Sequence, residues 1–248
     1  MKIIILALAL ASAGLEVTPG GQALPERSLL SLRFPASPAG QTAPNTTGGG
    51  GTRSGGACVQ AAEGAPPLSG IIPAFMTNPQ TTAQRPTLYF YIPPNGGYSG
   101  EIKLTDLVSQ GILVRQSFSL DPQGGILAVT LQPKTPLEAG QDYSWSLRII
   151  CNPEQRSNDQ YLKGNLSVVA APSSLSSAAP FLNQSPGAPL KPGQAPTILK
   201  LAQAYADQGI WLDSLHLTAL LRPSNPQDWQ ELLESVNLGA YSSAPFLP

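Results

Sequence analysis

The chain contains only two cysteines, and their positions limit the folds that it can adopt. Cys58 follows a glycine-rich tract, and the second cysteine ends the most strand-like segment, in which apolar residues occupy every second position: Tyr143, Trp145, Leu147, Ile149 and Cys151. Because side chains alternate between the two faces of a strand, the Cys151 sulfur belongs to the apolar face. A reactive thiol more often lies in an exposed, electropositive setting. We therefore predict a structural disulfide between Cys58 and Cys151, with two free thiols as the alternative.

The first thirteen residues have the features of a secretory signal. Lys2 provides a positive charge, residues 3–10 are apolar, and residues 11–13 (Ala-Ser-Ala) form a small-residue cleavage site. The apolar run is too short to cross a bilayer, which needs about 20 residues, and no other segment approaches that length. We therefore predict a signal peptide at 1–13 and a mature chain without a transmembrane span. The expected location is the periplasm or the cell exterior, where disulfides persist.

Changes in residue pattern divide the rest of the chain into four parts. Residues 14–57 are rich in Gly, Pro and Ser and lack a hydrophobic period, which predicts a flexible leader. Residues 58–171 have apolar residues at every second position between turn residues, which predicts short antiparallel strands. Residues 172–196 are rich in serine and proline and predict a linker. Between residues 197 and 238 the apolar residues recur at helical spacing, which predicts three helices.

These patterns predict an α+β fold. About six or seven short strands separated by turn residues are typical of a two-layer β-sandwich. The segment from Pro136 to Leu147 resembles the entry to a late strand in immunoglobulin-like domains, a likeness that concerns the fold alone. The first two helices resemble a single tetratricopeptide repeat, which cannot bury its own apolar face. We therefore expect an immunoglobulin-like antiparallel β-sandwich followed by a repeat-like helix pair plus a third helix, docked on the sandwich or, alternatively, on a partner.

The composition argues against several classes of function. Charged residues make up 12% of the chain, and its formal net charge is −1. Affinity for nucleic acid rests on clustered Lys and Arg, so nucleic acid is not an expected partner. One histidine and no Cys-x-x-Cys motif leave too few ligands for a four-coordinate zinc site, so we expect no metal and no cofactor.

The sequence does not single out a catalytic residue. His216 is the only histidine, and the chain has no Gly-x-Ser-x-Gly motif, so nothing indicates a Ser-His-Asp triad. We expect His216 to be a surface or partly packed residue of a helix. The paired carboxylates of a glycosidase would meet only in the fold, so a hydrolase of that kind stays open as an alternative.

One loop and one strand carry candidate binding residues. The loop with Arg156, Asn158 and Asp159 follows Cys151 directly, so a disulfide would hold its base rigid. In the alternative interpretation, Arg156 and Asp159 pair with each other or cap the turn.

Tyr89 and Tyr91 lie on one face of the predicted strand Thr87–Ile92. They would form a stacking platform for a sugar or peptide if that face is open. They would instead face the helices if the helical segment covers the sheet.

Several short motifs in a fixed order resemble one protein family. They are Gly-Gly-Ala-Cys58, Arg85-Pro-Thr, Tyr91-Ile-Pro-Pro, Leu137-Glu-Ala-Gly, Cys151-Asn-Pro, Arg156-Ser-Asn-Asp and Ile210-Trp-Leu-Asp-Ser-Leu. Together they resemble a bacterial, largely cyanobacterial family catalogued as domain of unknown function 928, and the resemblance covers roughly residues 55–236. The resemblance implies an exported protein and supplies no catalytic residues.

We therefore predict a non-enzymatic binding or adaptor module of the cell envelope, with an envelope protein or a glycan as its partner. The first alternative is a carbohydrate-binding module that uses Tyr89, Tyr91 or Tyr98. The second is a hydrolase whose carboxylates converge only in the fold.

Overall fold

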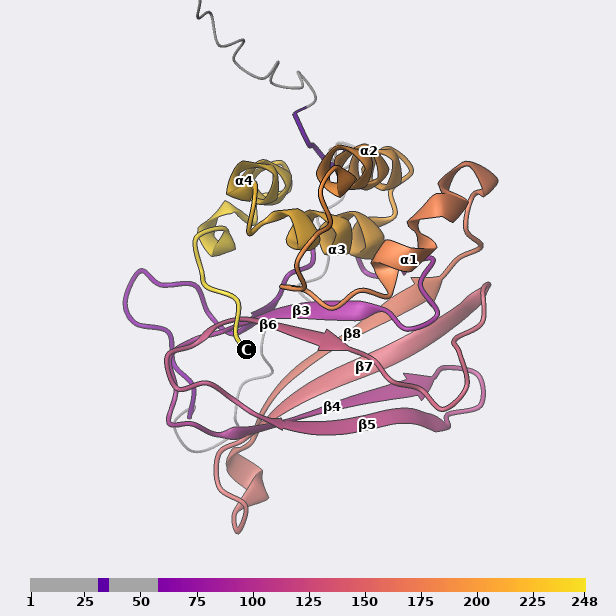
Figure 1. Ribbon diagram of the computed structural model, residues 1–248. Coiled ribbons are helices and arrows are strands. Elements are labelled where there is room, and N and C mark those ends of the chain that lie inside the picture. Colours follow the sequence, from indigo (N-terminus) through magenta and orange to yellow (C-terminus); the bar gives the residue numbers. More distant parts are fainter. Residues whose placement is uncertain (1–30, 36–57) are drawn as a thin grey trace, which may run out of the picture. The chain divides into compact units, whose positions relative to one another are not determined.

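The computed structural model describes residues 31–35 and 58–248 (Figure 1). The predicted signal peptide and the rest of the predicted leader lie outside the described residues. The strands are β1 (Ser69–Gly70), β2 (Gln80–Thr81), β3 (Thr87–Ile92), β4 (Ser99–Asp106), β5 (Ile112–Ser119), β6 (Gly125–Thr130), β7 (Gln141–Ile150) and β8 (Gln160–Val168). The α-helices are α1 (Ala179–Leu182), α2 (Gln194–Asp207), α3 (Trp211–Leu221) and α4 (Pro226–Glu234). Short 3-10 turns are η1 (Arg156–Asn158), η2 (Ser173–Ala178) and η3 (Gly239–Tyr241).

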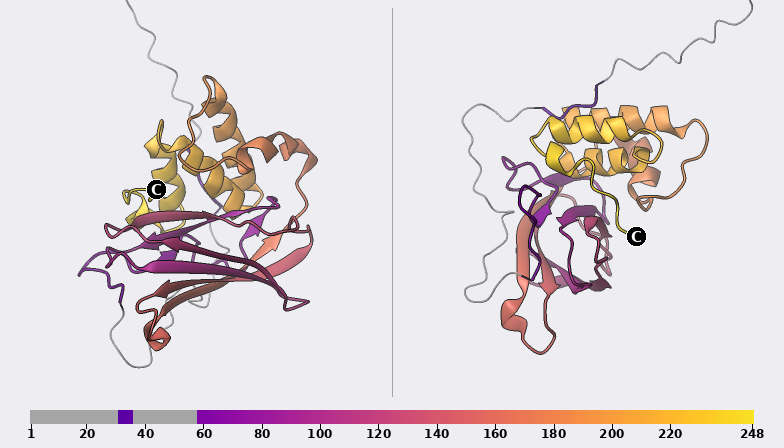
Figure 2. Two further views of the ribbon diagram at one scale, coloured as in Figure 1. Left: turned by 60° about the horizontal axis from the view of Figure 1, so that its bottom comes forward. Right: turned by 90° about the vertical axis from the view of Figure 1, so that its left-hand side faces the viewer.

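The strands form two sheets that face each other. One sheet has the order β1-β3-β6, and the other has the order β2-β8-β7-β4-β5. Every pairing is antiparallel except that of β2 with β8, which is parallel. The helices α2, α3 and α4 form a layer on the side of β3 and β6, while β4 and β5 lie on the far side of the sandwich (Figures 1 and 2). The predicted α+β architecture, a β-sandwich followed by helices, is confirmed.

Strand β7 shows how the alternating sequence builds the core. The apolar residues of its inner face are all buried: Tyr143, Trp145, Leu147 and Ile149. Trp145 packs edge-on against Phe90 of the opposite sheet, with ring centroids 5.3 Å apart. Gly164, the partner of Trp145 on β8, makes this packing possible, because a Cβ atom there would lie 2.4 Å from the indole ring.

The entry to β7 has the geometry of a tyrosine corner. The hydroxyl of Tyr143 accepts a hydrogen bond from the backbone N–H of Glu138 at 3.1 Å, and Leu137 is buried beside it. In immunoglobulin-like sandwiches a conserved tyrosine at the corresponding corner makes such a bond to the backbone upstream. The likeness of this segment to a late strand of such domains therefore extends to its hydrogen bonding.

Helix α3 docks the helical segment on its own sandwich. All eleven residues of α3 are buried, since α2, α4 and the strands β2 and β3 surround it. The indole N–H of Trp211 donates to the carbonyl of Ile71 at 2.9 Å, which anchors the start of α3 to the strand side. The apolar faces of the helix pair are thus covered within the chain.

Two segments predicted to lack structure contain packed residues. Within the predicted leader, Leu32 and Phe34 are buried, and the Phe34 ring meets Trp211 edge-on at 5.2 Å. Within the predicted linker, η2 and α1 bury Leu175 and Leu182. Each of these groups contains too few apolar residues to produce a hydrophobic period in the sequence. They are nevertheless buried, because they pack against apolar surface of the helices.

The predicted disulfide between Cys58 and Cys151 is present, with the two Cα atoms 5.7 Å apart and a sequence separation of 93. Both cysteines are half-buried. The amide of Gln160 ties the neighbouring residue Val59 to β8, accepting from its N–H at 2.6 Å and donating to its carbonyl at 3.1 Å. The disulfide and this amide therefore fix the Cys58 segment to both β7 and β8. Within the described ranges, no helix is both long and apolar enough to cross a membrane.

Candidate functional site

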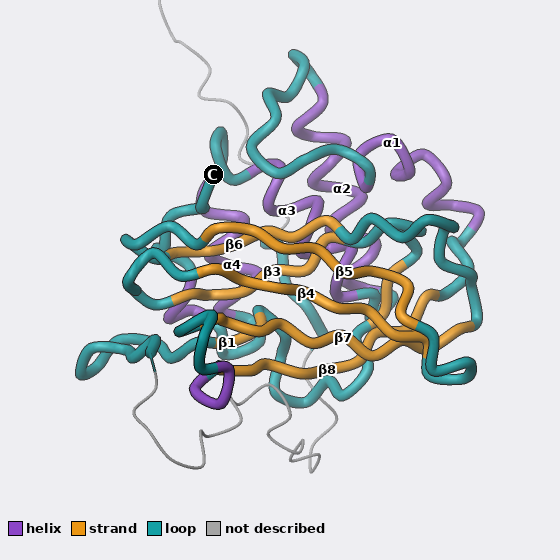
Figure 3. The backbone as a smooth tube through the Cα atoms, turned by 90° about the horizontal axis from the view of Figure 1, so that it is seen from below, coloured by secondary structure: helices purple, strands orange, loops and turns teal. Residues whose placement is uncertain are grey.

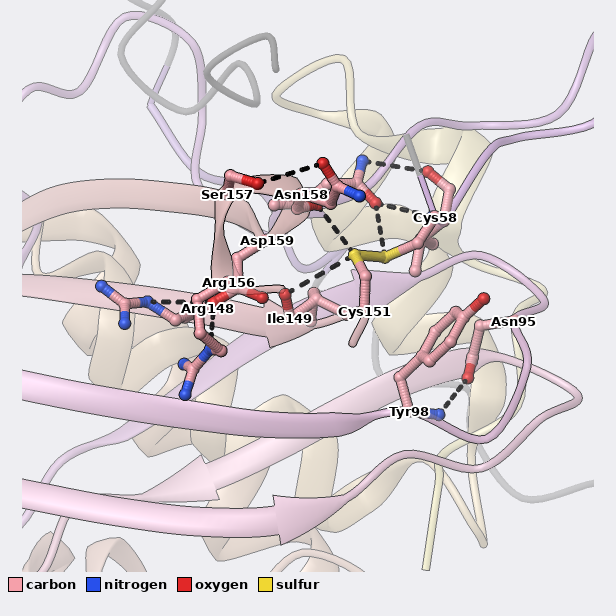
Figure 4. Close-up of a disulfide and its surroundings, with 12 residues drawn as sticks. Cys58, Asn95, Tyr98, Arg148, Ile149, Cys151, Arg156, Ser157, Asn158 and Asp159 are labelled. Atoms are coloured by element: carbon pink, nitrogen blue, oxygen red, sulfur yellow. Dashed lines mark hydrogen bonds and ion pairs between the residues drawn. A yellow bond between two sulfur atoms is a disulfide. The ribbon is translucent and has the colours of Figure 1, made fainter. Parts of the chain in front are cut away.

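The loop between Cys151 and β8 is held at both ends, which gives its side chains fixed positions (Figure 4). The disulfide fixes the start, and the pairing of β8 with β7 fixes the end. The turn η1 lies between these two points. Arg156 occupies its first position and Asp159 directly follows it.

Asp159 joins two arginines from different parts of the chain. Its Oδ2 atom lies 2.8 Å from Nε of Arg156 and 3.8 Å from Nε of Arg148, which is on β7. The Asp159 side chain is 0% exposed, and its Oδ1 atom has no hydrogen-bond partner among the described residues. Because a buried charge is costly unless it is paired, this carboxylate requires the two guanidinium groups beside it. The hydrogen bond to Asp159 also raises the pKa of Arg156 above its ordinary value.

Both arginines keep their outer nitrogens available. Each approaches Asp159 through Nε, and in the described structure neither donates a hydrogen bond from a terminal nitrogen to another residue. The Arg148 side chain is 37% exposed and that of Arg156 is 45% exposed. Figure 4 shows the terminal nitrogens of both groups extending away from the carboxylate. The Tyr161 ring supports Arg148 from beneath, 4.8 Å from the guanidinium carbon.

The two arginines border the outer face of the five-stranded sheet, which is rich in cations. In one row across the sheet, Glu101, Arg148 and Tyr161 are direct partners, and Arg115 pairs with Glu101 at 3.1 Å. In the next row Lys103 lies directly opposite Arg115, with Ser146 and Lys163 beyond it. Like charges directly opposite each other destabilise a sheet.

This positive face contrasts with the whole chain, whose formal net charge is −1. It carries Lys103, Arg115, Arg148, Arg156 and Lys163. The carboxylates on the same face are Glu101, Asp142 and Asp159. Seen from below, the strands lie in front of the helices (Figure 3), and no described helix covers β4, β5 or β7 from that side. The cations are therefore concentrated on a surface that the described part of the chain leaves open.

The other candidate residues lie elsewhere. Tyr89 is only 2% exposed and faces the helices, where its ring meets Trp229 and Phe246 at 6.2 Å. Tyr91 is half-buried, with its ring 5.3 Å from that of Tyr241. Tyr89 is therefore buried under the helices, which is the second of the two interpretations of this tyrosine pair, and it does not form an open stacking platform.

Two further candidates lie near the disulfide without joining the arginine pair. The Asn158 side chain lies 3.5 Å from the hydroxyl of Ser157. Tyr98 is half-buried, and its backbone N–H donates to the Asn95 side chain (Figure 4). Of the loop candidates, only Arg156 and Asp159 contact each other, as the interpretation that they pair predicts.

The expectation that His216 is a surface or partly packed residue is wrong. The residue is 3% exposed, and its two ring nitrogens contact Phe181 and Tyr89. The Phe181 carbonyl can only accept, so Nε2 carries the hydrogen and donates at 3.3 Å, while Nδ1 accepts from the Tyr89 hydroxyl at 2.8 Å. Burial lowers the pKa of His216 to about 4, which keeps the ring neutral. Its position between helix and sheet indicates a structural role.

Sequence reasoning missed Arg148, which completes the site. Its place on the polar face of β7 follows from the alternation of that strand, but its partner does not. The contact with Asp159 depends on the register of β7 against β8 and on the turn between them, neither of which is a local pattern. In the described ranges no group of three or more His, Cys, Asp or Glu side chains is placed to hold a metal ion.

The fold and the site define a disulfide-bonded β-sandwich whose smaller sheet is covered by its own helices and whose larger sheet presents a basic face. The model of the family described as Domain of Unknown Function (DUF928) matches residues 48–246, and the chain belongs to this family. No curated protein matches the sequence. Among solved structures, the chain is similar to CopC from Methylosinus trichosporium OB3b, with 12% identity, a TM-score of 0.29, and coverage of 43% of this chain and 97% of that chain.

Proposed function

We propose that the protein is an exported binding module of the cell envelope and that its ligand is an acidic polysaccharide. The ligand lies across the outer face of the five-stranded sheet, with one acidic group held by Arg148 and Arg156. These arginines share one buried carboxylate through Nε and keep their terminal N–H groups open, which is the main support for an acidic ligand. A guanidinium fork matches the geometry of a carboxylate or sulfate group.

The site is organised before a ligand arrives. Arg148 is fixed by a central strand and by the Tyr161 ring, and Arg156 is fixed by a turn that begins at the disulfide. Holding flexible side chains in place costs entropy on binding, so positions that folding has already set favour affinity. Two arginines share the single negative charge of Asp159, so the group as a whole carries a net positive charge at the surface.

The rest of the face suits a linear chain with repeated charges. Residues two apart on a strand lie about 7 Å from each other, so the row of Lys103 and the row of Arg148 follow at that spacing. Ser146 and Asn165 are short polar residues on the same face, suited to hydrogen bonds with hydroxyl groups. Lys103 lies directly opposite Arg115, whose charge is paired with Glu101, and an anionic ligand would offset the repulsion between the two cations.

Export is proposed from two features of the chain. The first thirteen residues resemble a secretory signal, and the disulfide persists only in an oxidising compartment. A polysaccharide of the envelope or its surroundings is an anion available in that location.

Binding of the mature chain to sodium alginate, with dextran as the neutral counterpart, tests the proposal by calorimetry. A triple variant, Arg148→Gln with Arg156→Gln and Asp159→Asn, removes both cations without leaving a buried charge. Its control is Lys191→Gln, which makes the same net change of charge at an exposed position just before α2. We expect the triple variant to bind alginate at least about tenfold more weakly, since charge-assisted hydrogen bonds are lost. The control should bind like the parent.

The dependence of alginate binding on salt concentration provides a second test of the proposal. Contacts between exposed charges weaken as the Debye length shortens to about 3 Å at 1 M ionic strength. We expect alginate binding to weaken steeply with added salt in the parent and much less in the triple variant. Equal binding of alginate and dextran, or equal loss in the triple variant and the control, would exclude the proposed site.

A further inference from the structure

A pocket, distinct from the basic face, lies where the helical segment meets the end of the sandwich. Its volume is 270 Å³, close to the lower end of the range of about 300–1,000 Å³ that is usual for ligand sites. The walls are mostly aliphatic, with Val169, Leu175, Leu182 and Ala171 among the lining residues. The polar lining residues are Thr82, Gln84, Ser176, Asn183 and Tyr205, and the hydroxyl oxygens of Thr82 and Tyr205 lie 3.2 Å apart. The pocket is thus largely apolar with a defined polar wall.

Asp213 lies behind Thr82, and its contacts determine which hydroxyl donates in the hydrogen bond between Thr82 and Tyr205. Both carboxylate oxygens accept: Oδ1 from the Thr81 hydroxyl, and Oδ2 from the backbone N–H and the hydroxyl of Thr82. The Thr82 hydroxyl has a single hydrogen, and Asp213 takes it. The 3.2 Å contact between the hydroxyl oxygens of Thr82 and Tyr205 is therefore donated by Tyr205.

This direction leaves the Tyr205 oxygen, on a residue that lines the pocket, as an acceptor. Its own hydrogen points at Thr82, and no described residue donates to it. Asn183 is similar, because its amide nitrogen donates to the Ala179 carbonyl at 2.9 Å, which leaves its oxygen open. The backbone N–H groups of Ala83 and Val169 are already bonded to Thr81. Gln84 and Ser176, which also line the pocket, carry hydrogens of their own, so the wall acceptor that has given away its only hydrogen and receives none from the described residues is the Tyr205 oxygen.

The charge near the pocket also selects its occupant. No lysine, arginine or histidine is among its lining residues, and the Asp213 carboxylate lies directly behind Thr82. An anionic ligand would be repelled and would find no cation.

We propose that this pocket binds a small, neutral, largely apolar molecule that donates one hydrogen bond, from a hydroxyl or an amide N–H, to the oxygen of Tyr205. The site is separate from the basic face. The pocket includes Val168 at the end of β8, whereas Asp159 immediately precedes the start of that strand. Nine residues of a strand span about 30 Å. The inference therefore does not depend on the polysaccharide proposal.

Two probes of nearly equal shape test the donor requirement. Benzyl alcohol can donate a hydrogen bond, whereas benzyl methyl ether can only accept. Titration of each into the mature chain, followed by methyl chemical shifts in NMR spectra, gives both affinities. We expect the alcohol to bind about three- to tenfold more tightly than the ether, the range that corresponds to one hydrogen bond. Benzoate, which is anionic, should not bind.

Variants locate the binding. Tyr205→Phe should make the alcohol no better than the ether, and Ala171→Phe, which places a ring at an exposed wall position, should abolish binding of both. Ala240→Phe is the matched control at an exposed alanine outside the pocket and should change nothing. The proposal is overturned if the parent binds neither probe, binds both equally, or keeps its affinity in Ala171→Phe. If Tyr205→Phe does not fold, the comparison of the two probes in the parent still tests whether the pocket requires a hydrogen-bond donor.

Discussion

The Nδ1 atom of His216 lies 2.8 Å from the hydroxyl oxygen of Tyr89, and this contact joins helix α3 to strand β3. Three residues of α3 make such polar contacts at the boundary between helices and strands. Trp211 donates to Ile71, and Asp213 accepts from Thr81 and Thr82. Because each of these α3 side chains is buried, leaving its polar atoms without a hydrogen-bond partner would lower the stability of the fold. These polar contacts thus specify where α3 sits on the sandwich, in addition to apolar packing.

Removal of the Tyr89 hydroxyl should destabilise the fold. Tyr89→Phe leaves the buried Nδ1 of His216 without a donor, and an unsatisfied buried acceptor costs about 1–3 kcal/mol. Urea unfolding monitored by circular dichroism gives the free energy of unfolding. Tyr91→Phe is the control on the same strand, since no described residue bonds the Tyr91 hydroxyl, and it should change stability little. Equal effects of the two variants would contradict the role assigned to the Tyr89–His216 bond.

His216 and Asp213 should make opposite contributions to stability as pH changes. Burial lowers the pKa of His216 to about 4 in the folded chain, so its contribution is present above the unfolded pKa of about 6.5 and is lost as pH falls toward 4. Burial raises the pKa of Asp213 to about 6, so its contribution is present below about 3.8 and is lost as pH rises through 6. Between pH 7 and 4.5 each contribution changes by about 2 kcal/mol, and the two nearly cancel.

A variant without the histidine should reveal the contribution of Asp213. In His216→Gln, the free energy of unfolding should increase by about 2 kcal/mol from pH 7 to pH 4.5, while in the parent these two groups should leave it nearly unchanged. Urea titrations at the two pH values measure the difference. A variant that follows the parent at both pH values would show that His216 does not titrate as described.

The features that sequence predicted are those set by local patterns. The alternation of β7 is a property of consecutive residues, so it assigned Tyr143, Trp145 and Leu147 to the core and Arg148 to the polar face. The disulfide followed from that alternation and from the presence of only two cysteines. The family resemblance, by contrast, rested on an ordered set of short motifs, and the match over residues 48–246 confirms it.

The features that sequence did not predict depend on contacts between distant segments. Helix α3 is buried on every side, so it lacks the polar stripe that would place His216, whose partner Tyr89 lies 127 residues earlier in the chain. Arg148 meets Asp159 only because of strand register and a tight turn. Phe34 lies in a region without hydrophobic period, and its packing needs Trp211 of a remote helix. None of these contacts leaves a periodic signal.

Gly164 should tolerate no side chain. A Cβ atom in Gly164→Ala would lie 2.4 Å from the Trp145 ring, which is fully buried and packed against Phe90. Overpacking of a core costs about 1–3 kcal/mol. Gly70→Ala is the control beside the same indole, because its Cβ would make ordinary contacts of 3.6 and 3.7 Å. Thermal unfolding should show a lowered Tm for Gly164→Ala and little change for the control.

Loss of the disulfide should weaken the fold and loosen the arginine loop. The bond closes a loop over a separation of 93 residues, and in the chain-entropy model such a bond contributes about 4–5 kcal/mol. The double variant Cys58→Ser with Cys151→Ser should lose stability of that order in urea unfolding. Its amide hydrogens between residues 152 and 158 should exchange faster, because the disulfide fixes the start of this loop. Native chain in which both thiols are alkylated before any reductant is added would contradict the bond itself, and unchanged exchange in the double variant would show that β8 alone orders the loop.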